Sequence, residues 1–169
     1  MAKVLNITMT TLTPLYTGEV RQRIRNANKA VLPVRSTATG KIIIPFKGAI
    51  RAAHKALTNN QAENDKLFGR MGSTGILDID FLLSKKDKNE IVDLATHMKL
   101  NQFGTREGDF RAEEVIEGSE FEARIVVKNN SDDAVKTVKD TLKYLEKKGI
   151  GGWTGKGYGK VIFTIQEQK

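Results

Sequence analysis

The residues with the clearest chemical potential form a glycine-rich stretch at positions 149–160, with the sequence GIGGWTGKGYGK. Six of these twelve residues are glycine, and Trp153, Lys156 and Tyr158 stand among them. Glycine adopts positive φ easily and lets another backbone approach closely, and successive backbone amides can bind an anion. Because ordering such a loop costs conformational entropy, we expect a phosphate ligand or a tight crossing to compensate, unless the stretch is disordered.

Known nucleotide-binding loops do not match this stretch. A Walker A loop needs Ser or Thr after its lysine and precedes a helix, whereas Lys156 is followed by Gly157. A dinucleotide fingerprint also opens a helix, and this loop is expected to follow one. Two interpretations stay open: the loop contacts a nucleic acid, with aromatic rings stacking on bases, or its glycines only allow a tight crossing with Trp153 in the core. The contact residues expected under the first are Gly151, Gly152, Trp153, Lys156 and Tyr158.

Positive charge is concentrated in the first third of the chain. The formal net charge is +8, and residues 1–62 hold ten Lys or Arg against one acid, Glu19. Residues 20–41 therefore form a candidate contact for a polyanion, although a solvated loop with arginines for solubility is the alternative. The candidate contact residues in this segment are Arg21, Arg23, Arg25, Arg35 and Lys41.

Composition limits the class of protein. Of the 169 residues, 39% are hydrophobic and 28% are charged, which suits a soluble globular protein with its own core. There is no cysteine, which excludes disulfides and thiolate metal sites. No apolar run is long enough to span a bilayer, and the first residues lack the features of a signal peptide. We expect a single domain over residues 1–169, a cytoplasmic location, no cofactor, no metal and no membrane partner.

Hydrophobic periodicity predicts the elements that position these residues. Alternating or short apolar runs predict strands at 3–12, 42–44, 76–83 and 160–166, with a strand pair at 113–127. Apolar stripes predict helices over 46–57 and 131–148. Residues 58–65 read as a polar connection, and 103–110 as a protruding loop. The order is β-α-β-β-α-β, which indicates an α+β, ferredoxin-like (RRM-like) core.

The two predicted helices differ in their surface charge and in their end signals. In the first, Lys47, Arg51 and Lys55 recur every four residues and form a basic stripe. The second begins with Ser131 as N-cap and ends at Gly149.

Four segments together resemble the RAMP superfamily of CRISPR-associated proteins. They are the glycine loop with its following strand, IIIPFKGAIRAAHKAL at 42–57, LFGRMGSTGILDIDF at 67–81 and EEVIEGSEFEARIVV at 113–127. They cover most of the chain in the family's order. The likeness is strongest to the backbone subunit of type III and type IV effector complexes, which polymerises along the guide RNA.

This resemblance implies a domain that binds CRISPR RNA, stacks head to tail with other copies, and assembles with other effector subunits on target RNA or DNA. A thumb-like insertion is expected at about 84–118, with 97–114 as the hairpin that flips a nucleotide. The resemblance further places Lys47 and Arg51 against the RNA backbone. It places Arg21, Arg23 and Arg25 near the guide–target duplex.

The chain departs from the family pattern in two places. Its Gly-Ser-Ser-Leu element is missing between Pro45 and Phe46. Where target-cutting relatives carry an Asp in the first long loop, this chain has Asn28 or Lys29 and no carboxylate. Because metal-assisted cleavage needs a hard oxygen ligand, we expect no target cleavage and lean against an enzyme.

Two other functions stay open. The first is a CRISPR RNA processing endoribonuclease of the same superfamily, which needs a general base such as histidine. The candidates are His54, expected on a partly exposed helix surface, and His97, near the expected hairpin. The second is a generic RRM-like RNA binder, for which the predicted strands offer only Phe81 and Phe163 as stacking rings.

Overall fold

The computed structural model describes residues 2–17, 34, 36–100 and 102–168, and the cation-rich segment 18–33 and Arg35 lie outside the described residues. The elements, in chain order, are β1 (Lys3–Thr11), β2 (Lys41–Ile44), α2 (Lys47–Thr58), α3 (Gln61–Phe68), β3 (Gly69–Arg70), β4 (Ser73–Thr74), β5 (Leu77–Ile79), β6 (Leu82–Asp87), α4 (Lys88–Ile91), β7 (Val92–Leu100), β8 (Arg106–Val115), β9 (Glu120–Val127), α5 (Asp132–Lys148), the 3₁₀ turn η1 (Thr154–Lys156) and β10 (Val161–Gln168). The fold is α+β, as the sequence predicts.

A six-stranded sheet forms the centre of the molecule, with strand order β10-β1-β9-β6-β2 and β5 also paired with β9. Each of these strand pairs is antiparallel. Leu5, Ile7 and Met9 of β1 are buried and lie opposite buried residues of β9. The intervening residues of β1 are polar or half-buried. The period-two alternation therefore gives the sheet one apolar face and one polar face.

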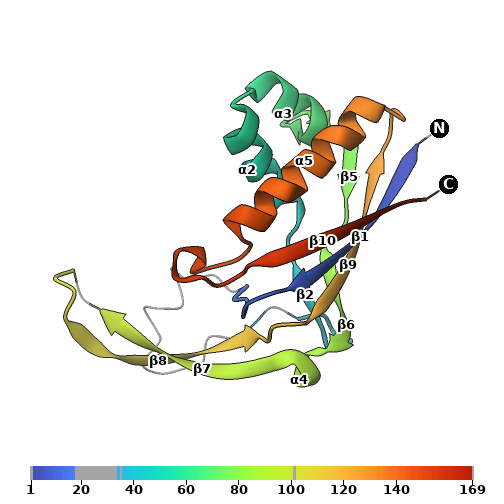
Figure 1. The fold of residues 1–169 in the computed structure, drawn as a ribbon. Helices are drawn as coiled ribbons and strands as arrows, with labels where there is room; N and C mark the ends of the chain where they lie inside the picture. Colours follow the sequence, from blue (N-terminus) through green and yellow to red (C-terminus); the bar gives the residue numbers. More distant parts are fainter. Residues whose placement is uncertain (1, 18–33, 35, 101, 169) are drawn as a thin grey trace.

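Helices α2 and α5 cover the apolar face (Figure 1). The Ser131 hydroxyl accepts a hydrogen bond from the Ala134 amide, and the Gly149 amide donates to the Leu145 carbonyl. These contacts satisfy backbone groups that helix ends leave unpaired. The stripe predicted for α5 is buried, and Ile50 and Ala53 of α2 pack into the same core. Within the described ranges, no helix is both long enough and apolar enough to cross a membrane.

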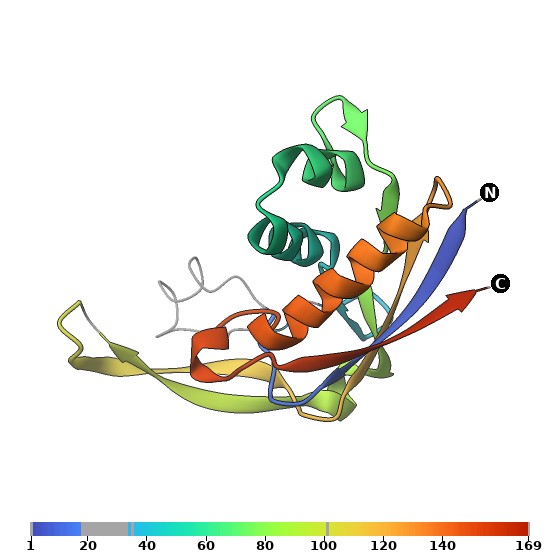
Figure 2. The same ribbon diagram turned by 45° about the horizontal axis from the view of Figure 1, so that its top comes forward.

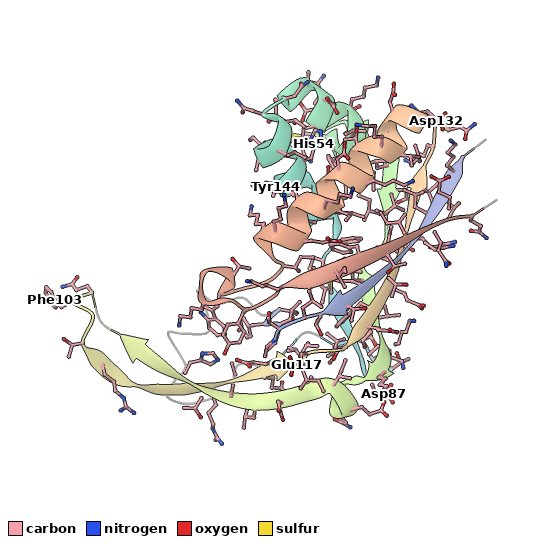
Figure 3. All side chains as sticks on the ribbon, in the orientation of Figure 1. His54, Asp87, Phe103, Glu117, Asp132 and Tyr144 are labelled. Carbon is pink, nitrogen blue, oxygen red and sulfur yellow. The ribbon has the colours of Figure 1, made fainter. Side chains whose placement is uncertain are left out.

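Strands β7 and β8 form a hairpin that extends well beyond the sheet and the helices (Figure 1). Phe103 lies at its tip and is 81% exposed, whereas Glu117 lies near its base (Figure 3). The hairpin occupies residues 92–115, inside the range expected for an insertion. Its base is fixed to the rest of the molecule, because the amides and carbonyls of Leu15 and Val115 bond each other.

Three local predictions are wrong. Residues 61–68 form helix α3, because Asn60 caps the Glu63 amide and Leu67 and Phe68 are buried. The predicted strand 76–83 is two strands, and the alternation shifts between them, so Phe81 is exposed and Leu82 is buried. Residues 88–91, for which no helix was predicted, form α4 with a capping box at Asp87. Figure 2 shows the β3–β4 turn projecting beyond α3, far from the long hairpin.

Candidate nucleic-acid interface

The glycine loop crosses the segment that follows β1. The Gly152 amide donates to the Tyr16 carbonyl at 2.9 Å, and the Gly159 amide donates to the Pro14 carbonyl at 2.8 Å. The Thr13 hydroxyl adds a bond to the Gly157 carbonyl at 2.8 Å. These bonds hold the loop between the C-terminal end of α5 and the hairpin base (Figure 1). The chain passes from this crossing directly into the cation-rich segment 18–33.

Several of the loop's glycines are required by the crossing itself. A Cβ at Gly151 would overlap with the Tyr16 carbonyl oxygen, and a Cβ at Gly159 would overlap with the Ile150 carbonyl oxygen. Both residues also have positive φ, which disfavours any side chain. The amides of Gly157, Tyr158 and Lys156 bond carbonyls inside the loop. These amides are therefore engaged within the protein, which supports the crossing interpretation for this part of the loop.

Trp153 lies in a stack of rings that joins three distant segments. Its ring centroid is 4.4 Å from that of Tyr16, with 28° between the planes, and 4.5 Å from that of His97, with 27° between the planes. Tyr158 meets the indole edge-on at 5.9 Å. Trp153 itself is left-handed, with φ of 56°, a conformation that costs about 1–2 kcal/mol for a residue with a side chain. The contacts in the stack stabilise this conformation.

A buried carboxyl group holds His97 in this stack. The His97 Nε2 atom lies 2.6 Å from Glu114 Oε1, and both side chains are 7% exposed. In the hairpin register His97 lies opposite Phe110, whereas Glu114 lies opposite Asp93. The contact between His97 and Glu114 therefore crosses the hairpin diagonally. Burial raises the pKa of Tyr158 to about 12, and the nearby Glu114 carboxylate adds to the shift because it stabilises the protonated phenol. No local pattern in the sequence predicts that His97 has this partner.

Four of the cations expected to bind a polyanion lie outside the described residues: Arg21, Arg23, Arg25 and Arg35. The two ends of their segment are nevertheless described. Tyr16 bonds the glycine loop, and the Val34 amide donates to Glu113 Oε1 of β8 at 3.3 Å. Of the residues that flank this segment, Tyr16 therefore lies at the glycine loop and Val34 lies beside strand β8.

The remaining predicted cations divide into paired and unpaired groups. Lys41 pairs with Asp87 at 3.1 Å and donates to the Lys85 carbonyl. Arg51 donates to Asn64 Oδ1 and pairs with Asp65 at 3.3 Å, so its guanidinium joins α2 to α3. Lys47 is exposed and has no ion-pair partner among the described residues. Only part of the predicted stripe is therefore available to an outside anion.

His54 is fully buried, which corrects the expectation of a partly exposed helix residue. Its Nδ1 lies 3.1 Å from Asn64 Nδ2, and its Nε2 lies 3.3 Å from Glu63 Oε1. Phe68 meets the ring edge-on. Leu57, predicted on the buried stripe, is 45% exposed instead. The buried face of α2 therefore includes His54 and leaves out Leu57. Helix α3 packs against α2 and covers His54, and the sequence did not predict this packing.

Sequence reasoning missed two groups of residues at this site. Tyr16, His97 and Glu114 were not predicted to meet the glycine loop. Lysines at the end of α5 were not predicted as contacts either, although Lys143 and Lys147 are four residues apart and therefore share a helix face. No local sequence pattern indicates the first group, because their ring contacts join segments about 50–140 positions apart.

The polar face of the sheet carries a separate hollow of about 550 Å³. Its charged groups are largely compensated, because Arg124 bonds Asp80 and Lys85 pairs with Glu122. Phe81 and Leu83 are its exposed apolar residues. A compensated, partly acidic face attracts a polyanion less than the cationic segments beside the glycine loop do.

Comparison with known proteins identifies the family. The model of the RAMP superfamily matches residues 8–162. No curated protein matches the sequence significantly. Among solved structures, a chain in the cryo-EM structure of the type III-B Cmr-beta complex bound to cognate target RNA is similar, with a TM-score of 0.78 and 15% identity over 99% of this chain. At that identity the likeness concerns the fold, and this chain spans 61% of the length of the other. Because the family model covers nearly the whole sequence, the chain belongs to the RAMP superfamily.

Proposed function

We propose that this protein is the CRISPR RNA-binding backbone subunit of a multisubunit antiviral effector complex. One observation carries the proposal: the glycine loop, the residues that precede the cation-rich segment and the middle of strand β7 meet at Trp153, Tyr16 and His97. In this arrangement a guide strand lying over the loop would meet cations from one side and the hairpin from the other. The RAMP family match supports the same role.

The strand order supports a ferredoxin-like core for this subunit. Strand β9 lies between β1 and β5 and is antiparallel to both, which is the arrangement of a split β-α-β unit. Strand β10 pairs with the other side of β1. We infer one domain over residues 1–169, with the β7–β8 hairpin as the thumb within about 84–118.

The proposed RNA contacts combine cations predicted from the sequence with the exposed Lys47 and Lys156. The phosphates would be bound by Arg21, Arg23, Arg25, Arg35, Lys47 and Lys156, with the surface of Gly151, Gly152, Trp153 and Tyr158 beside them. Lys41 and Arg51 hold internal partners and would contribute less. The partners proposed are CRISPR RNA, target RNA or DNA, further copies of the chain and other effector subunits.

A processing endoribonuclease is the second candidate, and the His97–Glu114 pair is the observation that favours it. A carboxylate can orient a histidine for acid–base work. However, His97 is 8% exposed and lies under the Trp153 ring, so a ribose hydroxyl would have little access to it. The burial favours a binding role.

Expression of the full chain with a CRISPR array would test the proposal. A backbone subunit should purify with small RNA of uniform length and form ladder-like assemblies on it. A processing enzyme should instead cut a repeat hairpin in EDTA, and His97→Ala should abolish cutting while Glu117→Ala leaves it intact. Absence of bound RNA together with no affinity for added RNA would refute both roles.

A further inference from the structure

Five exposed lysines lie at the end of α5, on the glycine loop and immediately after it. They are Lys143, Lys147, Lys148, Lys156 and Lys160, here called the lysine arc. Lys143 and Lys147 are one helical turn apart, about 6 Å along the axis, which is comparable with the spacing of neighbouring phosphates in a single strand. Gly149 then turns the chain, so the last helical lysines lead directly onto the loop.

The lysine arc differs from the first half of the same helix in its ion pairs. Lys136 pairs with Asp140 at 3.1 Å, Lys139 pairs with Glu167 at 3.0 Å, and Lys3 pairs with Asp132. In contrast, none of the arc lysines has an ion-pair partner in the described part of the chain. The nearest acid on the helix, Glu146, accepts a bond from the Phe163 amide at 3.1 Å. The positive charge of the arc is thus uncompensated.

Helix electrostatics explain only part of this cluster. Lysines in the last turn are stabilised by the negative end of the helix dipole, which accounts for Lys147 and Lys148. It does not account for Lys156, which lies on the loop 5.8 Å from the Trp153 ring centroid, nor for Lys160 beyond it. Because the loop's amides are largely engaged by carbonyls, side-chain ammonium groups are its main means of binding phosphate.

We propose that the lysine arc is a binding track for the sugar–phosphate backbone of single-stranded RNA, which adds Lys143, Lys147, Lys148 and Lys160 to the contacts proposed above. The proposal rests on the function proposed above and extends its contact surface along α5. Lysine ammonium groups bind phosphate as point charges without reading bases. The rings beside them are stacked on one another, so the track should bind RNA independently of sequence.

The dependence of RNA affinity on salt tests this inference. The full chain is titrated with a labelled, unstructured 30-nucleotide RNA at several KCl concentrations, and log K is plotted against log salt. Each phosphate contact contributes roughly 0.7 to the slope for a single strand. The triple variant K143A/K147A/K148A should reduce the slope by about 2, and K156A/K160A by about 1.4. The matched control K136A/K139A, on the same helix, should leave it unchanged.

The outcomes separate the two proposals. If the unmodified protein binds RNA and both arc variants keep its slope, the arc is not a track and the proposed function stands. If the unmodified protein binds no RNA, the proposed function fails and the arc fails with it. If the control lowers the slope as much as the arc variants, the slope depends on the total charge of the protein and not on the position of these lysines, and the inference is wrong. Should the triple variant not fold, the loop variant K156A/K160A decides. Loss of protein–protein assembly at an unchanged slope would instead identify the arc as a docking site for an acidic protein.

Discussion

Gly151 lies against Tyr16 so closely that a methyl group on its Cα would overlap the Tyr16 carbonyl oxygen. The contact locks the glycine loop across the segment that leads into the cation-rich residues, and the next residue, Gly152, bonds the same oxygen at 2.9 Å. The glycines of this loop are therefore unequal in their structural importance, although they look alike in the sequence.

Alanine substitutions along the loop should lower the free energy of unfolding by different amounts at different glycines. Gly151→Ala and Gly159→Ala should each destabilise the protein by roughly 2 kcal/mol or more, because a Cβ adds overlap with a carbonyl to a left-handed backbone. Gly157→Ala, with positive φ and open space, should cost about 1 kcal/mol. Gly155→Ala is the control, because it has open space and no positive φ, and it should change stability by less than about 0.5 kcal/mol. Urea unfolding measures all four, and equal costs would contradict the crossing.

Removal of the Glu114 carboxylate should loosen the hairpin base. Glu114→Ala leaves the buried His97 and Tyr158 without their partner, and we expect a loss of about 3 kcal/mol in the free energy of unfolding. Glu114→Gln keeps a hydrogen-bond acceptor and should cost less than half as much. The exposed Glu117 gives the control Glu117→Ala, with little effect expected. Hydrogen exchange of the β7 and β8 amides would locate the change, and protection unchanged in Glu114→Ala would refute the coupling.

The raised pKa of Tyr158 predicts an alkaline loss of stability. The folded protein keeps the phenol protonated up to about pH 12, whereas an unfolded tyrosine ionises near pH 10.0. The stabilisation is fully present below pH 10 and is lost as the pH rises toward 12. Absorbance titration of the folded protein should therefore show a late ionisation step from Tyr158. Tyr158→Phe should abolish that late step and reduce the loss of stability between pH 10 and 11, and Tyr144→Phe should do neither.

Alanine substitution of Lys47 and of Arg51 should have different effects on stability and RNA binding, although both residues lie on the same basic stripe of α2. Arg51→Ala removes bonds to Asn64 and Asp65 and should cost about 1 kcal/mol of stability, because the guanidinium is partly exposed. Lys47→Ala should leave stability unchanged and reduce the salt slope of RNA binding by about 0.7. Thermal unfolding and RNA titration of both variants check this. A larger slope change for Arg51→Ala would show that its ion pair opens to the RNA.

Local signals in the sequence determined several parts of this protein. Helix α5 could be predicted with its ends, because Ser131, Gly149 and the apolar stripe between them are short-range features. The strand alternation of β1 and β9 and the position of the glycine loop followed in the same way. Helix α3 was missed because its residues are mostly polar, and Leu67 and Phe68 are its only buried apolar residues.

Other features depended on which segments the fold brings together. The sequence by itself determined the concentration of cations near the start, the α+β order of elements and the family motifs. Only the tertiary structure decided that Trp153 stacks on Tyr16 and His97 and that Glu114 holds His97. It also decided that α3 engages Arg51, whereas the lysine arc forms no ion pair with the residues that the structure describes. The physical reason is that composition fixes how much charge and apolar surface a chain carries, whereas pairing depends on distances between residues far apart in the sequence.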